Sequence, residues 1–204
     1  MDNTRMRAED IQAYERFNIR QRMSLTTNRY VVTVARPDGS DGEVVAFAEQ
    51  KRISLKEQMT IYTDESRKSV LSTFEASQVL DIGAEYEVRS GTGQIIGSFR
   101  QDPLASVART TWNVRQPGTM DLTGQERNRV VGVVRRIWGL LPFTDFVPFL
   151  WPYHFDFTES GKRLMAVDKK FGLRDRYVLD ILAPDIDRRL AITQAVALDA
   201  LESR

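Results

Sequence analysis

Alternation of apolar and polar side chains runs through most of this chain and predicts strands. In residues 17–25, Phe17, Ile19 and Met23 fall on one side and polar residues on the other, which is the pattern of a strand with one buried face. Comparable short runs follow, separated by turn-forming residues. They cover residues 30–36, 42–52, 59–62, 70–74, 78–82, 85–88, 94–100, 109–116, 153–157, 164–168 and 177–182. About twelve short strands with frequent turns predict a sandwich or a barrel.

The stretch from Asp187 to Arg204 has a different pattern and predicts a helix without a solvent-facing side. It contains no Gly or Pro, and its polar members Thr193, Gln194 and Asp199 fall roughly a third of a turn apart at about 100° per residue. A helix that is apolar nearly all round is enclosed by protein or set in a membrane. From residue 187 to residue 201 it would be about 22 Å long, which is too short to span a bilayer.

The dimensions of these elements favour an enclosed helix. A closed barrel of about twelve strands leaves room on its axis for one helix about 10 Å across, and strands of six or seven residues are about 20–23 Å long. We therefore predict a mainly β fold, a closed antiparallel barrel of about twelve strands enclosing a hydrophobic C-terminal helix. Asp185 or Asp187 is expected to cap the helix. Asp199 is expected near a barrel mouth or beside a basic partner, because an unpaired buried carboxylate is costly.

Residues 123–153 interrupt the strand pattern. Thr123 and Glu126 have the spacing of a capping box, residues 130–141 have helical periodicity, and an aromatic loop with three prolines follows. We predict an amphipathic helical insertion near 123–141. The helix and loop either cover one end of the barrel, dock a partner, or anchor the protein in a membrane interface. The candidate contact residues are Trp138, Phe143, Phe146, Phe149 and Trp151.

The domain organisation follows from the same patterns. Residues 1–16 are charged and short of apolar groups, and we interpret them as a flexible lead-in. Residues 17–204 are expected to form a single barrel domain, with 123–153 as the insertion.

Two segments carry a resemblance to a known family. The order of many short strands, the run Phe171-Gly-Leu-Arg-Asp-Arg-Tyr-Val-Leu-Asp180 and the terminal run from Asp187 to Asp199 resemble the tubby C-terminal-like superfamily. The nearest branches are the LURP-one-related and phospholipid-scramblase-like proteins. The resemblance implies a closed β-barrel around a central helix, and it implies that basic residues can bind phosphoinositides. It assigns no such residue in this chain.

Composition narrows the classes of function. The 29 basic and 28 acidic side chains give no electrostatic reason to expect nucleic acid. Cysteine is absent, which excludes disulfides and thiolate metal sites. The sequence contains no uninterrupted run of about 18 apolar residues, so we expect no membrane-spanning helix. We expect a cytoplasmic protein, free or attached peripherally to a membrane.

Catalytic chemistry has little support in the sequence. His154 is the sole histidine, so a nucleophile–histidine–acid set must use it. His154 and Asp156 share one strand face, and we interpret His154 as a structural residue rather than part of a dyad. We predict no enzyme, no catalytic or metal-binding residues and no cofactor.

Basic pairs are the main candidate binding residues. If several gather at one end of the barrel, they can hold an anionic head group; otherwise they form a solvated surface. We predict a non-enzymatic barrel module that binds an anionic lipid or membrane surface, with partner docking through 123–153 as the alternative and scramblase-like activity as a weaker one. The pairs are Lys51-Arg52, Arg67-Lys68, Arg135-Arg136, Lys162-Arg163 and Lys169-Lys170.

Overall fold

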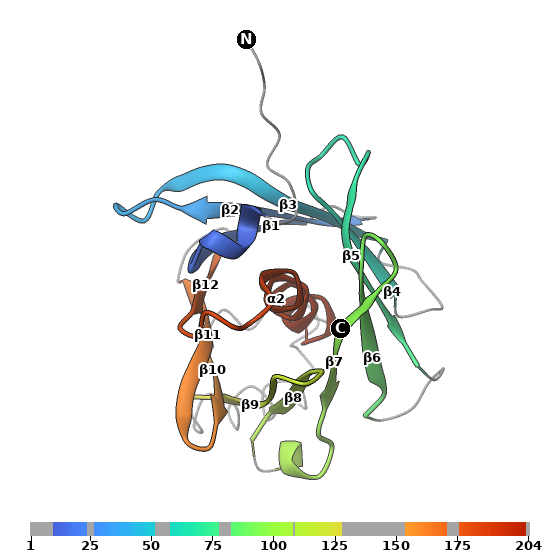
Figure 1. The fold of residues 1–204 in the computed structure, drawn as a ribbon, viewed down its shortest axis with the longest axis vertical. Helices are drawn as coiled ribbons and strands as arrows, with labels where there is room; N and C mark the ends of the chain where they lie inside the picture. Colours follow the sequence, from blue (N-terminus) through green and yellow to red (C-terminus); the bar gives the residue numbers. More distant parts are fainter. Residues whose placement is uncertain are drawn as a thin grey trace, which may run out of the picture.

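The chain forms a closed barrel around a helix (Figure 1). A computed structural model describes residues 10–23, 27–51, 58–77, 83–107, 109–127, 154–170 and 176–202. Within them are twelve strands, two short 3-10 turns and one α-helix. The elements are η1 (Asp10–Ala13), β1 (Arg16–Met23), β2 (Thr27–Ala35), β3 (Asp41–Lys51), β4 (Gln58–Tyr62), β5 (Val70–Ala76), β6 (Glu85–Ser90), β7 (Ile95–Gln101), η2 (Ala105–Val107), β8 (Thr111–Gln116), β9 (Met120–Glu126), β10 (His154–Glu159), β11 (Lys162–Lys170), β12 (Arg176–Ile181) and α2 (Arg188–Glu202). The predicted barrel and enclosed helix are confirmed.

Each strand pairs antiparallel with its neighbours in sequence, and β1 pairs with β12 to complete the ring. Closure leaves no open sheet edge. Because the strands alternate in direction, their ends fall at two mouths. At the mouth where α2 begins, called the α2-start mouth, lie the connections 36–40, 63–69, 91–94, 117–119, 160–161 and 182–187. At the opposite α2-end mouth, the strands finish at Met23, Lys51, Ala76, Gln101, Glu126 and Lys170.

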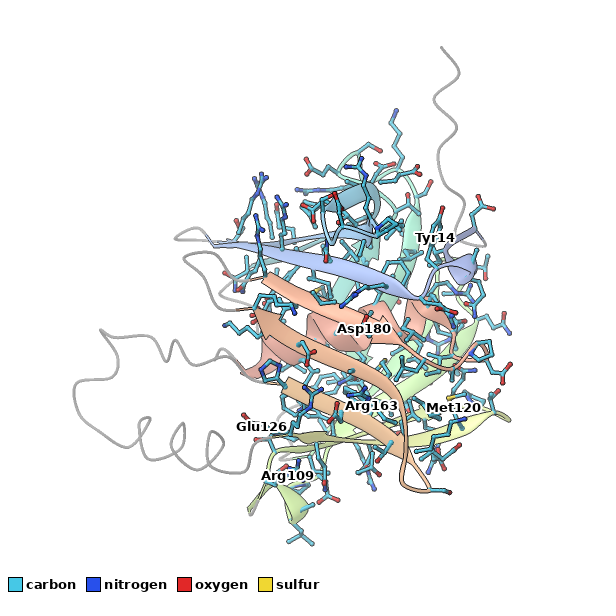
Figure 2. All side chains as sticks on the ribbon, turned by 90° about the vertical axis from the view of Figure 1, so that its left-hand side faces the viewer. Tyr14, Arg109, Met120, Glu126, Arg163 and Asp180 are labelled. Carbon is cyan, nitrogen blue, oxygen red and sulfur yellow. The ribbon has the colours of Figure 1, made fainter. Side chains whose placement is uncertain are left out.

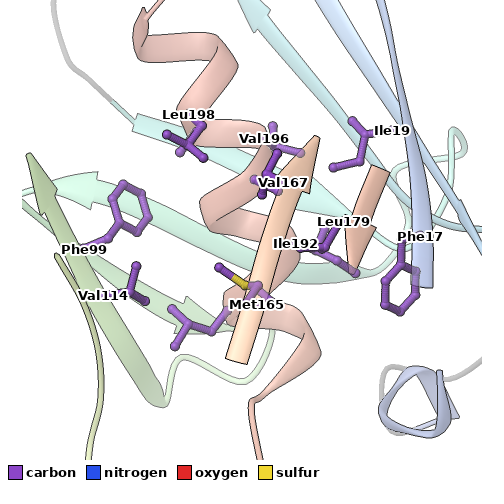
Figure 3. Packing of buried hydrophobic residues seen from close by; sticks show 14 of the residues in the cluster. Phe17, Ile19, Phe99, Val114, Met165, Val167, Leu179, Ile192, Val196 and Leu198 are labelled. Atoms are coloured by element: carbon purple, nitrogen blue, oxygen red, sulfur yellow. The ribbon is translucent and has the colours of Figure 1, made fainter. Parts of the chain in front are cut away.

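Inward side chains of the wall and the surface of α2 form one core (Figure 3). Alternation sends every second wall residue inward, and Phe17, Val167 and Leu179 are fully buried. Ile192, Val196 and Leu198 of α2 are also fully buried and face different parts of the wall (Figure 3). These side chains fill the barrel around α2, and a water-sized apolar recess lies between the start of α2 and strands β8, β9 and β11.

The approach of α2 to the wall depends on small residues at the contact. A Cβ built on Gly97 of β7 would lie 2.6 Å from Leu190 Cδ2, so any larger side chain would collide with the helix. The polar residues of α2 have partners in the wall at some positions. Thr193 Oγ1 lies 2.7 Å from Ser72 Oγ. The helix begins as predicted with Asp187 as its cap, whose Oδ1 accepts a hydrogen bond of 2.9 Å from the Arg189 backbone N–H.

At the α2-start mouth lies η1, within the segment that we interpret from the sequence as a lead-in. Ile11 is buried, and Gln12 Nε2 donates to the Pro184 and Ile186 carbonyls at 3.0 and 2.9 Å. The buried Arg188 guanidinium donates to the Tyr14 carbonyl at 2.9 Å and to carbonyls of the β12–α2 connection. Residues 10–16 are thus held by one buried apolar side chain and by hydrogen bonds to the start of α2. Residues 1–9 lie outside the described residues.

Near the α2-end mouth, a buried carboxylate joins the helix to the wall. Asp199 accepts a hydrogen bond of 2.8 Å from the Tyr30 hydroxyl and another from the Tyr177 hydroxyl. Gln21 Nε2 donates to the Tyr30 oxygen at 3.1 Å. Asp199 therefore lies close to a mouth, as expected, and two tyrosine hydroxyls replace part of its hydration.

The predicted strands match the structure except in two regions. Residues 123–126 belong to β9 rather than to a helix start, so the capping-box interpretation is wrong for them. Gln125 pairs with Thr111 of β8 and with Asp156 of β10, and these ladders hold the segment extended. The predicted strand at 78–82 and the predicted helix at 130–141 lie outside the described residues.

Candidate functional site

Cationic side chains face each other across neighbouring strands on one outer face of the barrel. Arg176 of β12 lies directly opposite Lys170 of β11 and opposite Arg20 of β1. In the next pair of strands, Arg22 of β1 lies opposite Arg29 of β2. All five side chains alternate with inward core residues and therefore point outward. We call Arg20, Arg22, Arg29, Lys170 and Arg176 the basic band.

Direct opposition of like charges destabilises a sheet, and the band is only partly neutralised. Arg20 pairs with Asp41, and Arg29 Nε lies 2.7 Å from Glu49 Oε2. Among the described residues, neither Arg22, Lys170 nor Arg176 forms an ion pair, and all three are exposed. Within the part of the chain that the structure describes, three of the five cations of the band thus have no acidic partner.

The acid nearest to one edge of the band is shared between two cations. Glu49 Oε2 accepts from Arg29 at 2.7 Å and from Arg67 Nη2 at 2.8 Å. The hydrogen bond from Arg29 is the main reason that the pKa of Glu49 is lowered from its ordinary value. Glu49 stays ionised but has one charge for two arginines, so it leaves this edge of the band positive.

On the adjoining wall of β9, β10 and β11, by contrast, the cations have acidic partners. Arg127 donates to both oxygens of Asp156, at 2.8 and 2.6 Å, and its Nη2 lies 3.3 Å from Asp168. His154 Nδ1 lies 2.9 Å from Asp168 Oδ1, and Arg163 lies 3.4 Å from Asp156. The hydrogen bond from Arg127 is the main cause of a lowered pKa at Asp156. Cations and carboxylates neutralise each other here.

Figure 2 shows the barrel wall from the side. Arg163 and Asp180 lie on it, Arg109 and Glu126 lie toward the α2-end mouth, and Tyr14 and Met120 lie toward the α2-start mouth. Asp180 pairs with Arg16 at 3.0 Å. Near the α2-start mouth, the cation Arg16 therefore has an acidic partner, Asp180, on β12. Near the α2-end mouth, the same strands carry the basic band.

The structure separates the basic pairs that it describes. Lys162-Arg163 and Lys169-Lys170 occupy opposite ends of β11, about 20–24 Å apart at the rise of a strand. Arg67-Lys68 belongs to the β4–β5 connection, from which Arg67 reaches Glu49 at the edge of the band. Lys170 belongs to the basic band, whereas Lys169 points inward, with Nζ 5.4 Å from the centre of the Tyr177 ring.

The remaining candidates cannot be placed in the site. Lys51 ends β3, and nothing is described of its side chain. The other candidates lie outside the described residues: Arg52, Arg135, Arg136, Trp138, Phe143, Phe146, Phe149 and Trp151.

His154 contacts Asp168 rather than Asp156, the residue that shares its strand face. His154 and Asp168 lie opposite one another in the β10–β11 register. The spacing of residues within one strand does not reveal this pairing. The described residues contain no group of three or more histidine, aspartate or glutamate side chains that could hold a metal ion. No described helix is long and apolar enough to cross a membrane.

Sequence reasoning missed four members of the band because each is a single cation in its own segment. Arg20 and Arg22 share the outer face of one alternating run, and that spacing is the one local signal. Arg29 and Arg176 join them only through the strand register. The band is therefore a product of pairing between segments that lie far apart in the chain.

The fold defines the class of the protein as a closed antiparallel barrel with a hydrophobic helix on its axis. The family model for LURP-one-related proteins matches residues 44–199. The chain therefore belongs to the LURP-one-related family, within the tubby-like superfamily, as the sequence resemblance indicates. A search of curated proteins finds no match.

Proposed function

We propose that this protein is a non-enzymatic barrel module that binds an anionic membrane surface, and that it serves as an adaptor there. The observation that carries the proposal is the basic band, in which like charges oppose each other across β11, β12, β1 and β2. An arrangement that costs stability in the free protein is relieved when anions lie over it. The family is not known as enzymatic, which is consistent with a binding role.

The chemistry of the band suits phosphate groups at a lipid surface. Arg22 and Arg176 are exposed guanidinium groups without an acid partner among the described residues, and a guanidinium binds phosphate through two parallel hydrogen bonds. Each basic side chain close to an anionic membrane contributes about 1 kcal/mol. Several together give reversible, salt-sensitive attachment.

Flotation with vesicles tests this function. Wild-type protein is expected to float with vesicles of phosphatidylcholine mixed with phosphatidylserine, and not with phosphatidylcholine alone, and the binding should weaken at high salt. Replacing Arg22 and Arg176 together by Gln should weaken binding roughly thirtyfold, from about 1 kcal/mol for each charge.

A second double variant provides a control of equal net charge. Arg36 and Lys162 are exposed cations at the α2-start mouth, and their replacement by Gln should leave vesicle binding unchanged within about twofold. Equal losses in the two double variants, or equal binding to neutral and anionic vesicles, would overturn the assignment of the band.

The alternative of partner docking through 123–153 falls mainly on residues outside the described part of the chain. If this alternative holds, the double variant with Arg22 and Arg176 replaced by Gln should bind the partner as well as the wild-type protein does. Scramblase-like activity is a weaker proposal, since α2 is a 15-residue helix enclosed in the barrel.

A further inference from the structure

Two arginines from different segments converge on one carboxylate oxygen at the edge of the basic band. Arg29 Nε of β2 lies 2.7 Å from Glu49 Oε2, and Arg67 Nη2 of the β4–β5 connection lies 2.8 Å from the same oxygen. We call Arg29 and Arg67 the arginine pair. Their side chains are 54 % and 44 % exposed, whereas the side chain of Glu49 is 18 % exposed. The two arginines therefore cover the carboxylate and keep further N–H groups open to a ligand from outside.

Arg67 is held by its side chain as well as by its turn. Its backbone has a φ of 58°, in the left-handed region that favours glycine and is costly for a residue with a Cβ. Asp64 fixes the turn, because its carboxylate accepts from the Ser66 N–H at 2.7 Å and its carbonyl accepts from the Arg67 N–H at 3.2 Å. The Arg67 guanidinium lies 5.4 Å from the centre of the buried Phe47 ring. Strained residues gather at ligand-binding sites, and this one holds a guanidinium beside Arg29.

Within the described part of the chain, this contact joins two positive charges to one negative charge. The hydrogen bond from Arg29 is the main cause of the lowered pKa of Glu49, so Glu49 is ionised at neutral pH. A planar guanidinium binds the oxygens of a phosphate in the same way as those of a carboxylate. A ligand with two negative charges therefore matches the arginine pair better than Glu49 does.

Glu49 acts as a tethered competitor for any anion that approaches the arginine pair. A carboxylate attached to the same fold has a high effective concentration at the two guanidinium groups. A phosphodiester, which has one negative charge, therefore displaces this carboxylate poorly. A phosphate monoester carries a charge of about −1.5 to −2 at neutral pH, because its second pKa is about 6. The additional charge favours displacement of the carboxylate.

We propose that the arginine pair is a subsite for the terminal phosphate monoester of a lipid head group, and that Glu49 makes this subsite selective for a dianion. The inference rests on the proposed function, and it names the kind of anionic lipid that the barrel recognises. The subsite is continuous with the basic band, because Arg29 lies opposite Arg22 of β1. When the lipid binds, its phosphate takes the place of the Glu49 carboxylate between the two guanidinium groups, and Glu49 turns toward water.

Vesicles of matched surface charge test the selectivity. Phosphatidic acid has a terminal phosphate monoester and phosphatidylserine has a phosphodiester, so each lipid is mixed with phosphatidylcholine to the same zeta potential. Wild-type protein should bind the phosphatidic acid vesicles about fivefold more tightly at neutral pH. At about pH 5 the monoester carries a single charge, and the preference should fall below about twofold. The lowered pKa of Glu49 keeps the competing carboxylate ionised at both pH values.

Single variants distinguish Glu49 and the arginine pair from ordinary surface charges. Glu49→Gln removes the competing charge, so binding to phosphatidylserine vesicles should rise about fivefold and the preference for phosphatidic acid should disappear. Glu43→Gln is the matched control, because Glu43 is an exposed acid on the same strand, and it should keep the preference. Arg67→Gln should lose the preference, because Arg29 and Glu49 then neutralise each other. Arg36→Gln changes the charge equally and should keep the preference.

The outcomes separate this inference from the proposed function. Equal binding of wild-type protein to the two anionic vesicles, or equal effects of Glu49→Gln and Glu43→Gln, would overturn the selectivity and leave membrane binding in place. Binding to neither anionic vesicle would overturn both. Release from phosphatidic acid vesicles by millimolar glycerol phosphate would assign the arginine pair to a soluble phosphate monoester and overturn the lipid as its ligand.

Discussion

The Tyr30 hydroxyl donates to the Asp199 carboxylate at 2.8 Å, and the two residues are 169 positions apart in the chain. The bond joins the second strand of the wall to the last turns of the axial helix. Because both groups are buried, neither can exchange its partner for water without opening the barrel. The position of the helix along the barrel axis is therefore fixed by polar as well as apolar contacts.

Removal of this hydroxyl should destabilise the fold. In Tyr30→Phe, Asp199 loses one of its two tyrosine donors and Gln21 loses an acceptor, so the free energy of unfolding should fall by about 1–3 kcal/mol. Urea denaturation measures the change. Tyr62→Phe on the outer face of β4 is the control and should alter stability by less than about 0.5 kcal/mol. Equal losses in the two variants would show that the buried bond has no special weight.

Gly124 gives the ring of Phe157 its space in the barrel interior. A Cβ at position 124 would lie 2.3 Å from Phe157 Cε1, and Phe157 is fully buried. Gly124→Ala should cost about 1–3 kcal/mol by overpacking. Combined with Phe157→Leu, the total loss should be smaller than the sum of the single losses, with a coupling of at least about 0.5 kcal/mol. Strict additivity in denaturation experiments would contradict the contact.

Gln194 on α2 is a buried amide with no hydrogen-bond partner among the described residues. Replacement by Met keeps the length of the side chain and removes its polar atoms. We expect Gln194→Met to raise the free energy of unfolding by about 1–2 kcal/mol, because an unsatisfied buried polar group is costly. Calorimetry measures the shift in the unfolding temperature. A decrease would show that the amide has a partner in solution.

The Arg127–Asp156 contact predicts a dependence of stability on pH. The pKa of Asp156 is lowered mainly by the hydrogen bond from Arg127, so the folded state holds the ionised carboxylate more strongly than the unfolded chain does. Its contribution to stability is present above the ordinary pKa of 3.8 and is lost as the pH falls through the lowered folded value.

Denaturation at several pH values tests this dependence. Asp156→Asn should flatten the decline in stability between about pH 5 and pH 2, and Arg127→Gln should flatten it similarly. The effect should be modest, because the pair is partly exposed and screened by water. If stability declines as steeply in both variants as in the wild type, the Arg127–Asp156 contact does not cause the pH dependence.

The sequence predicts the barrel because alternation and turn residues mark most strands, and because α2 is apolar on all sides. It fails at β9 for a physical reason. Two of the inward positions of this strand are Gly124 and Glu126, so a large apolar residue does not mark every second position. Gly124 is small because Phe157 of β10 occupies the space. That neighbour is known only once the strands are paired.

The candidate site is less predictable than the fold. Lys170 stands out as part of a basic doublet, whereas Arg22 and Arg176 stand alone in the sequence and gain significance from the cations beside them. Register also decides the contacts on the neutralised wall of β9 to β11. There, His154 contacts Asp168 and not Asp156, the residue that shares its strand face. Cross-strand register decides both outcomes, and alternation within a strand does not determine it.

The junction between η1 and α2 also constrains how the protein is made. Tyr14 and Arg188, which hydrogen bond at this junction, are 174 residues apart, and β1 pairs with β12 beside it. At a synthesis rate of about 10 residues per second, the first strand waits roughly 15–20 s for its final neighbour. During this interval the partly made barrel has an open edge and no helix inside. Newly synthesised chains should therefore depend on chaperones until the last strand and the helix have left the ribosome.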